Sequence, residues 1–501
     1  MTVETNRGAP TPPIAFDAEP ASVGARIGAQ RVELDDAFLT RLRGACADVR
    51  VDDAALVEAS RDWWPLAMIW ALDGDVGARA GALARPGSES EVAAVVACCN
   101  DARVPVTTAA GRSGVCGASI PVHGGVVLDV TGLAGIVDVD AQSMLVDVRA
   151  GTFGDVFEDT LRKEHAVTVG HWPQSIALST VGGWLACRGA GQLSTRYGKI
   201  EDMVTGLDVV LADGSVVRTG GAPRAAVGPD LTQLFVGSEG TLGVITGARL
   251  RLHPAPSATR RAAYAFGSFA DGLDACRRVL RRGGRPAVLR LYDAIEADRS
   301  YQTGDRHVLL VLDEGDPHVV DATMRIAEEE CAGTEALDVS LVERWMEHRN
   351  DVSALEALVR RGYVVDTMEI AGPWRSLVPI YERACAALLA VEHTLVASAH
   401  QSHAYSDGAC LYFTFAGKPP PEQREAYYVA AWDAGQRAVL AAGGALSHHH
   451  GVGLNRSRYV REALGSGLDV LAAVKSALDP RGVLNPGKLG LPSPFGTPAW
   501  P

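Results

Sequence analysis

Long apolar runs are missing from this chain of 501 residues. No stretch approaches the roughly 18–20 residues that cross a bilayer, and the N-terminus lacks the charged and apolar regions of a secretion signal. A basic excess is missing too, since 47 Lys and Arg stand against 60 Asp and Glu, a net charge of −13. We therefore expect a cytoplasmic protein without a transmembrane segment that does not bind nucleic acid through a general basic surface. A local basic pocket for an anionic substrate remains compatible with this charge.

Paired cysteine motifs are also missing. The nine Cys are scattered, odd in number and never spaced C-x-x-C. This pattern fits a reducing compartment and neither a disulfide framework nor a zinc cluster. Hydrophobic residues (47%) and charged residues (21%) have the balance of an ordinary soluble protein. The length predicts two or three domains.

The local signals predict an α+β protein in four regions. The first begins with a loose arm of about 25 residues rich in Pro, Ala and Gly. The second has a helix capped by Ser88 and Glu91, followed by two hairpins. The third alternates strands and helices, as a domain with an antiparallel or mixed sheet does, and the fourth contains a histidine run and a last helix. The expected boundaries are 1–79, 80–255, 256–446 and 447–501.

Three loops rich in glycine and hydroxyl residues could hold a nucleotide by their backbone. They span residues 107–117, 170–198 and 237–246, each beside strand-like segments. Glycine lets backbone N–H groups approach a diphosphate, and successive N–H groups form an anion-binding nest. Each loop alone could be an ordinary turn, but the three together favour an extended nucleotide. The first is not G-x-G-x-x-G and no helix clearly follows it, so it does not fit a Rossmann site.

Several ionisable side chains are candidates for chemistry. The triplet His448–His450 could exchange protons near neutral pH, or could be an exposed loop. Tyr412 shares one face of a strand with Cys410, and is either a core aromatic or a base whose pKa nearby cations would lower. Arg290 stands among apolar residues, so it must reach either a structural ion-pair partner or a cleft.

Two further patterns resemble other kinds of site. Residues 482–488 have P-loop spacing, but Leu489 replaces the required Ser or Thr and Asn485-Pro486 interrupts the loop. His400 and His403 could supply two ligands to a metal such as zinc. We predict no bound metal, while this histidine pair keeps metal-assisted oxidation as an alternative.

Five stretches make the chain resemble the vanillyl-alcohol-oxidase and para-cresol-methylhydroxylase (PCMH) flavoprotein superfamily. Within it, the chain looks most like the alkyldihydroxyacetonephosphate (alkylglycerone-phosphate) synthases, because relatives that oxidise 2-hydroxy acids have Gly-Glu-His where this chain has three His. The likeness covers about residues 60 to 480. It implies a two-part PCMH-type FAD-binding domain and an α/β cap domain with a mainly antiparallel sheet. The stretches are Gly170-His171 with Pro173, Ser179 to Trp184, Gly198 with 200–202, Gly237 to Thr246, and Ser447 to Gly453.

The resemblance implies roles for particular residues. It implies non-covalent FAD, because Arg112 stands where some members attach the flavin through a His. It makes Tyr412, His448, His449 and His450 catalytic. It makes Arg290, Arg360, His171 and His400 substrate-binding, with Arg361 nearly as good as Arg360. The residues implied at FAD are Thr108, Ala109, Ala110, Gly111, Arg112, Ser113, Gly114, Gln174, Ser175, Ile176, Ala177, Leu178, Ser179, Thr180, Cys187, Arg188, Gly189, Ala190, Glu239, Gly240, Thr241, Leu242, Gly243, Val244 and Ile245.

The activity that the resemblance implies belongs to ether-lipid synthesis. The acyl group of acyl-dihydroxyacetone phosphate would be exchanged for a long-chain alcohol through an adduct at flavin N5. One departure is His400, where the synthases have Arg, and a second is the absence of a peroxisomal tail. An FAD-linked dehydrogenase or oxidase of a 2-hydroxy acid or other alcohol is the alternative, and a flavin-binding protein without turnover is a third. The expected partners are a small-molecule or lipid-like substrate, a membrane surface in peripheral contact, and a second copy in a homodimer.

Overall fold

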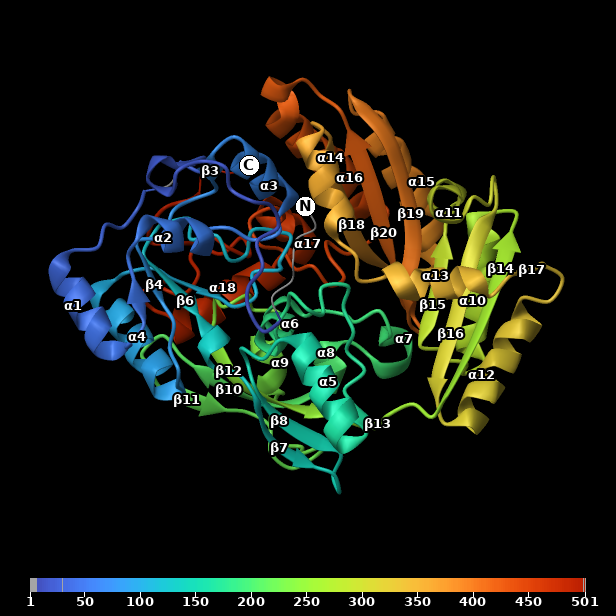
Figure 1. Ribbon diagram of the computed structural model, residues 1–501, viewed down its shortest axis with the longest axis horizontal. Helices are drawn as coiled ribbons and strands as arrows, with labels where there is room; N and C mark the ends of the chain where they lie inside the picture. The colour runs from blue at the N-terminus through green and yellow to red at the C-terminus, as the bar shows by residue number, and fades with distance from the viewer. Residues whose placement is uncertain (1–6, 29, 499, 501) are drawn as a thin grey trace.

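Two sheets form the left-hand part of the molecule in Figure 1. The first has four strands in the order β2-β4-β6-β5, with β4, β6 and β5 parallel. The second has five antiparallel strands in the order β11-β10-β12-β8-β7. The strands are β2 (Val49–Arg50), β4 (Ala82–Ala84), β5 (Val106–Ala109), β6 (Val126–Asp129), β7 (Ile136–Asp140), β8 (Leu145–Arg149), β10 (Val204–Val210), β11 (Val216–Arg218) and β12 (Val244–Arg251). The structure is a computed structural model that describes residues 7–28, 30–498 and 500.

A seven-stranded sheet forms the right-hand part, in the order β17-β14-β16-β15-β19-β20-β18. Every neighbouring pair in it is antiparallel. The predicted α+β class, with a two-part FAD-binding region and a mainly antiparallel cap sheet, is therefore confirmed. The strands are β14 (Ala258–Phe266), β15 (Val288–Tyr292), β16 (His307–Gly315), β17 (Glu335–Leu337), β18 (Val364–Pro373), β19 (Thr394–Ala404) and β20 (Gly408–Gly417).

Helices cover these sheets and close the space between them. Helices α10, α12, α15 and α16 contact the seven-stranded sheet, whereas α4 and α6 contact the five-stranded one. Helices α7 and α11 contact β15 and β19 at the centre of the large sheet. The main helices are α4 (Glu89–Ala102), α5 (Gly154–His165), α6 (Val181–Cys187), α7 (Ser194–Tyr197), α10 (Phe269–Arg281), α11 (Ala294–Tyr301), α12 (Pro317–Glu330), α13 (Ser340–His348), α14 (Ser353–Arg360), α15 (Trp374–Leu389), α16 (Arg424–Ala441) and α18 (Gly467–Leu478).

Local sequence signals placed the capped helix and both hairpins correctly. Ser88 caps α4 by accepting a hydrogen bond from the Glu91 N–H. The hairpins β7–β8 and β10–β11 form at the predicted places, because an alternating apolar pattern with polar turns favours antiparallel pairing. The four-region boundaries remain a prediction.

The N-terminal arm differs from its prediction. Its first six residues lie outside the described range. From Arg7 the chain is packed rather than loose, since the Arg7 guanidinium contacts two aspartates of α5, Ile14 is fully buried and the Trp63 indole donates to the Thr11 carbonyl. Specific polar contacts therefore order a segment whose composition suggested a free arm.

The C-terminal region returns to the first half of the molecule. The Asn485 N–H donates to the Val106 carbonyl, and the Val106 N–H donates to Val483. The Lys488 ammonium is fully buried and donates to the Ile120 carbonyl. The P-loop-like stretch therefore has a structural role.

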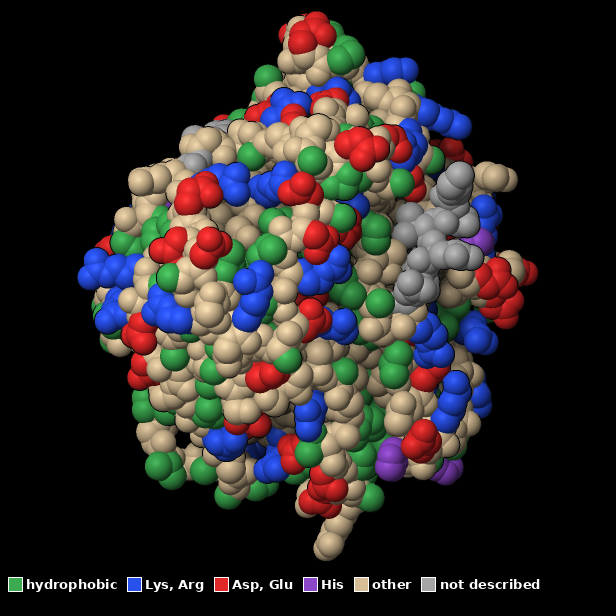
Figure 2. Space-filling model, turned by 60° about the vertical axis from the view of Figure 1, so that its left-hand side comes forward, with side chains coloured by type: hydrophobic (Ala, Val, Ile, Leu, Met, Phe, Trp, Pro, Cys, Tyr) green, Lys and Arg blue, Asp and Glu red, His purple; other side chains and the backbone are tan. Residues whose placement is uncertain are grey.

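The surface carries both signs of charge. On the face shown in Figure 2, basic and acidic side chains alternate without gathering into a large field of one sign. Among the described residues, none of the helices is long and apolar enough to span a bilayer.

Candidate active site

One cavity of about 750 Å³ lies between the glycine loops and the inner face of the seven-stranded sheet. All seven predicted residues of the first loop line it, from Thr108 to Gly114. Of the other residues predicted at FAD, those that line it are Gln174, Ser175, Leu178, Ser179, Thr180, Cys187, Gly189, Ala190, Glu239, Gly240, Gly243 and Ile245. The remainder lie outside the lining: Ile176, Ala177, Arg188, Thr241, Leu242 and Val244. Ile176, Leu242 and Val244 are core side chains instead.

Antiparallel pairing brings four polar side chains into one row across the large sheet. Tyr292 of β15 lies opposite His400 of β19, which lies opposite Tyr412 of β20, which lies opposite Glu369 of β18. Side chains at paired positions project from the same face. These residues, spread along the chain from position 292 to position 412, therefore meet beside the cavity.

A β-bulge places two histidines on the same face. The register between β19 and β20 shifts between Gln401 and His403. In a regular strand, positions 400 and 403 would point to opposite faces, but an extra residue in a bulge re-aims the next side chain. Both His400 and His403 consequently line the cavity.

Two buried carboxylates hold the histidine loop, residues 447–453. Glu369 accepts from the backbone N–H groups of His448, His449 and His450, from the Ser447 hydroxyl at 2.7 Å and from Arg456 at 2.8 Å. Burial opposes its ionisation, but Arg456 and the histidines hold the pKa of Glu369 at about 2.

Glu239 holds the following part of the same loop. It accepts from the Val452 and Gly453 N–H groups at 2.6 and 2.8 Å. Gly451 has a positive φ of 81°, and a Cβ there would clash with a Glu239 carboxylate oxygen, so the position favours glycine. Glu239 therefore lines the cavity while its carboxylate positions the loop.

The imidazoles beside the cavity are neutral in ordinary buffer. Burial lowers the pKa of His400 and His450 to about 4 and that of His448 to about 3. It also lowers the pKa of His403 and His449 well below the usual value. His449 and His450 line the cavity, whereas His448 lies behind them. Neutral imidazoles can both accept and donate a proton.

Tyr412 lies at the centre of this group. Its ring stacks on His400, with centroids 4.9 Å apart and planes at 18°, and its hydroxyl donates to Thr367 Oγ1 at 3.1 Å. Burial raises the pKa of Tyr412, and Glu369 and Asp366 add to the increase. The expectation that neighbouring cations would lower this pKa was wrong, because burial and two carboxylates outweigh Arg290. Tyr412 is a neutral hydroxyl donor.

Arg290 is fixed by a chain of hydrogen bonds. Its Nε donates to the Tyr292 hydroxyl at 2.7 Å and its NH2 donates to His400 Nε2 at 2.6 Å. Because guanidinium nitrogens only donate, His400 Nε2 must be unprotonated and Nδ1 must carry the hydrogen. Nδ1 then donates to Glu296 at 3.0 Å. Both ring nitrogens of His400 are therefore committed, beside a cation, which does not suit a metal ligand.

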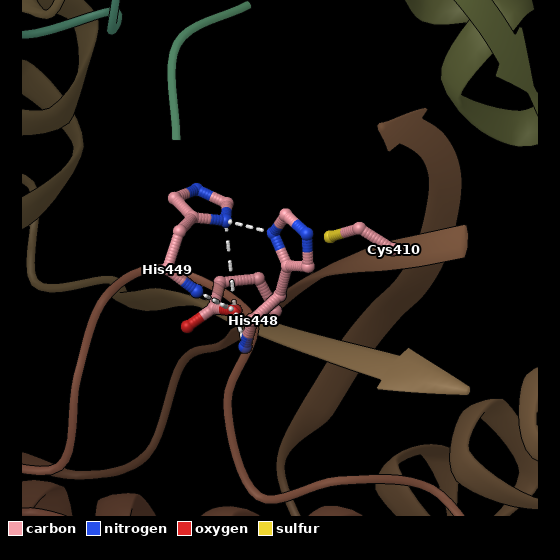
Figure 3. Close-up of side chains that lie close together, drawn as sticks. Cys410, His448 and His449 are labelled. Carbon is pink, nitrogen blue, oxygen red and sulfur yellow. Dashed lines mark hydrogen bonds and ion pairs between the residues drawn. The ribbon is translucent and has the colours of Figure 1, made fainter. Parts of the chain in front are cut away.

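Another group of side chains has metal-ligating atoms close together. These atoms, of Glu369, Cys410, His448 and His449, lie within 4.8 Å of one another (Figure 3). However, the Glu369 oxygens already accept from several N–H groups and from Arg456, and burial raises the pKa of the Cys410 thiol. A divalent ion needs free, deprotonated ligands. We assign no metal to this group.

Arg360, predicted to hold substrate, does not reach the cavity. Its side chain is 38% exposed, and its guanidinium pairs with Glu356 and Asp17. Arg349, at the end of α13, lines the cavity instead. It lies over the rings of Trp172 and Trp345, at 5.1 and 5.6 Å, and its buried NH1 has no hydrogen-bond partner among the described residues. Burial lowers the pKa of Arg349 to about 10, so it remains a cation at neutral pH.

Three functional candidates were not predicted from the sequence: Arg349, Glu296 and Glu369. Glu369 was detectable, because an acid among the apolar residues of β18, like Asp366 in the same strand, must find a partner, by the argument applied to Arg290. Arg349 could not be singled out in this way, because it follows a helix rich in charged residues.

Two structural observations indicate that the cavity could hold FAD. Buried polar atoms of Thr108, Arg112 and His171, all lining residues, have no hydrogen-bond partner within the part of the chain that the structure describes, and such atoms normally have one. A Cβ at Gly114 would meet nothing closer than 4.0 Å, so space is open beside this backbone. His171 is fully buried, and burial lowers its pKa to about 3. The glycine loops would hold the diphosphate.

We predict that the flavin is released by denaturation without proteolysis. Arg112, with a positive φ of 53°, stands where the resemblance places the flavin-linked His of covalent members, and its guanidinium lies 3.6 Å from Asp129. It offers no nucleophile. Acid precipitation should leave yellow colour in the supernatant, measured by absorbance, whereas colour retained in the washed pellet would contradict the prediction.

Two protein-family models match the chain. The FAD binding domain matches residues 80–220, and the C-terminal domain of FAD linked oxidases matches residues 255–489. The Escherichia coli (strain K12) uncharacterized FAD-linked oxidoreductase YgcU is 31% identical, covering 81% of this chain and 88% of its own. Alkyldihydroxyacetonephosphate synthase of Dictyostelium discoideum is 28% identical, over 81% of this chain and 72% of its own. The Bacillus subtilis glycolate oxidase subunit GlcD is 27% identical, over 81% of this chain and 88% of its own length.

Solved structures show the same fold. An alkyldihydroxyacetonephosphate synthase superposes with a TM-score of 0.76 at 23% identity, covering 95% of this chain and 90% of its own. A p-cresol methylhydroxylase superposes with a TM-score of 0.73 at 18% identity, covering 93% and 99%.

Proposed function

Because this chain belongs to the FAD-linked oxidoreductases and contains their FAD-binding and C-terminal oxidase domains, we propose that it is an alkylglycerone-phosphate synthase-like enzyme of ether-lipid synthesis. FAD is its cofactor. The enzyme would exchange the acyl group of acyl-dihydroxyacetone phosphate for a long-chain alcohol. The observation that carries this proposal is that Tyr412, His449 and His450 pack together at the cavity.

Each residue would have a distinct task in this reaction. The bound flavin would supply an electron-accepting ring system. Arg290 and Arg349, both cationic and lining the cavity, would bind the phosphate, since guanidinium groups suit bidentate contacts to phosphate. His449 and His450, kept neutral by burial, would accept a proton from substrate. Tyr412, whose pKa is raised, would donate its hydroxyl hydrogen to a developing negative charge.

Oxidation of a 2-hydroxy acid or other alcohol is the second candidate. It is favoured by the relatives YgcU and GlcD, named as an oxidoreductase and an oxidase. The same residues could serve it, with Arg349 binding a carboxylate. A cytoplasmic location, a homodimer and peripheral contact with a membrane are further proposals.

An anaerobic experiment separates the two candidates. Acyl-dihydroxyacetone phosphate should bleach the flavin absorbance, and a long-chain alcohol should restore it with no electron acceptor present and with an ether-linked product. A dehydrogenase would instead be bleached by a hydroxy acid or alcohol. Recovery that strictly requires oxygen or a dye would overturn the proposed exchange.

We predict that Arg349→Met raises KM for the anionic substrate about 10- to 100-fold, because one charge-assisted hydrogen bond contributes about 1.5–3 kcal/mol. The change should leave the flavin spectrum intact. Arg360→Met is the matched control, because this exposed ion pair contributes little. Steady-state kinetics check both variants. Equal effects at the two positions would contradict the assignment of Arg349.

A further inference from the structure

A continuous chain of hydrogen bonds joins two imidazoles of the cavity through residues outside it. His449 Nδ1 lies 2.9 Å from His448 Nδ1, and His448 Nε2 lies 3.0 Å from the Tyr405 hydroxyl. That hydroxyl lies 3.2 Å from Ser194 Oγ, which lies 2.7 Å from His403 Nδ1. His403 and His449 line the cavity, whereas the three residues between them do not.

Each member of this chain has the two polar positions that a relay requires. The Tyr405 and Ser194 hydroxyls each contact two neighbours, one on either side. His448 uses one ring nitrogen in each direction. A hydroxyl or a neutral imidazole accepts at one point while it donates at another. A proton can therefore move along the chain by successive transfers.

The ends of the chain are free to meet substrate. Among the described residues, Nε2 of His403 and Nε2 of His449 form no hydrogen bond. In Figure 3 the second ring nitrogen of His449 points away from His448. Each end thus offers one unpartnered nitrogen on a residue of the cavity lining.

We propose that His449, His448, Tyr405, Ser194 and His403 form a proton relay that forces the two cavity imidazoles into opposite hydrogen-bonding states. When His449 Nε2 accepts a proton, its Nδ1 hydrogen passes to His448 Nδ1. The Nε2 hydrogen of His448 passes to Tyr405, the Tyr405 hydrogen passes to Ser194, and the Ser194 hydrogen passes to His403 Nδ1. His403 then releases its Nε2 hydrogen into the cavity. Every member ends neutral, with its tautomer or hydroxyl direction reversed.

Because of this coupling, one of the two cavity imidazoles can always accept a proton while the other can donate one. It rests on the proposed function in one respect, because a redox-neutral exchange must take a proton in its first half and return it in its second. The relay keeps that proton within the protein, and the second half-reaction resets the tautomers. An oxidation would use the same relay in a single direction.

The test breaks the relay at residues that do not line the cavity. Tyr405→Phe and Ser194→Ala should lower kcat by roughly 10²-fold, with KM and the flavin spectrum unchanged, and Ser194→Thr should recover most of the rate. Tyr427→Phe is the matched control, because it removes a tyrosine hydroxyl bonded to Thr394 at 3.0 Å outside the site. Normal kcat in both relay variants would overturn the proposal.

A second readout does not depend on activity. In holoenzyme labelled with ¹⁵N-histidine, long-range ¹H–¹⁵N spectra report which ring nitrogen carries the hydrogen, and His403→Gln and His449→Gln assign the signals. We expect His403 and His449 to have hydrogens on opposite nitrogens, and Tyr405→Phe to remove this correlation. The same nitrogen protonated in both would refute the relay even if the exchange activity is found. If the two imidazoles have opposite tautomers but the enzyme shows no exchange activity, only the proposed function would be refuted.

Discussion

Replacing Tyr412 with phenylalanine is expected to remove most turnover while FAD remains bound. The hydroxyl donates to Thr367 and lies on a ring stacked against His400, so phenylalanine preserves the packing and deletes only the donor. Positioned acid–base groups contribute about 10²–10⁴-fold. Turnover at saturating substrate and the flavin absorbance spectrum measure the two outcomes.

The pH profile distinguishes the role of this hydroxyl. Because burial raises the pKa of Tyr412, the phenol stays protonated at neutral pH. The wild-type rate should therefore not increase with pH through ionisation of this phenol. Thr367→Val is the companion variant, because it removes the acceptor while leaving the phenol in place. A near-normal rate in Tyr412→Phe at the pH optimum would contradict the assignment.

Replacing Glu369 with glutamine is expected to lower the free energy of unfolding by about 3–5 kcal/mol, because it leaves the fully buried Arg456 without its counter-charge. Turnover should fall as well, since three backbone N–H groups of the histidine loop lose a carboxylate acceptor. Denaturant unfolding and steady-state kinetics measure the two effects.

The pH dependence of stability provides an independent check on Glu369. The pKa of Glu369 is about 2 in the folded protein, against an ordinary value of 4.5. The unfolded chain therefore binds the proton first, and the stabilisation, complete above pH 4.5, is lost as the pH falls toward 2. The stability of the Glu369→Gln variant should therefore lack this pH-dependent contribution.

Two further variants identify the source of the loss. Glu356→Gln, which breaks the surface pair with Arg360, should cost about 1 kcal/mol or less. The double variant Glu369→Gln with Arg456→Met removes both buried charges, so it should recover stability without recovering turnover. Full turnover in either variant lacking Glu369 would show that the carboxylate does not position the histidine loop.

Local sequence determined much of the fold. The Ser88 cap, the alternating hairpins and the glycines of the loops depend on neighbouring residues, so the elements could be located from the chain alone. The histidine triplet and Tyr412 were also singled out from sequence, because their motifs resemble those of the alkylglycerone-phosphate synthases. These predictions rely on interactions between residues close in sequence or on motifs shared with related proteins.

Tertiary structure alone decided how the site is assembled. Position 403 reaches the face of position 400 only because β19 contains a bulge, and strand alternation alone predicts the opposite. Arg349 replaces Arg360 in the cavity because α13 and α14 are placed differently against it, which charge pattern does not encode. Long-range pairing, packing and burial set these positions and the pKa of each group, and none of them can be read from neighbouring residues.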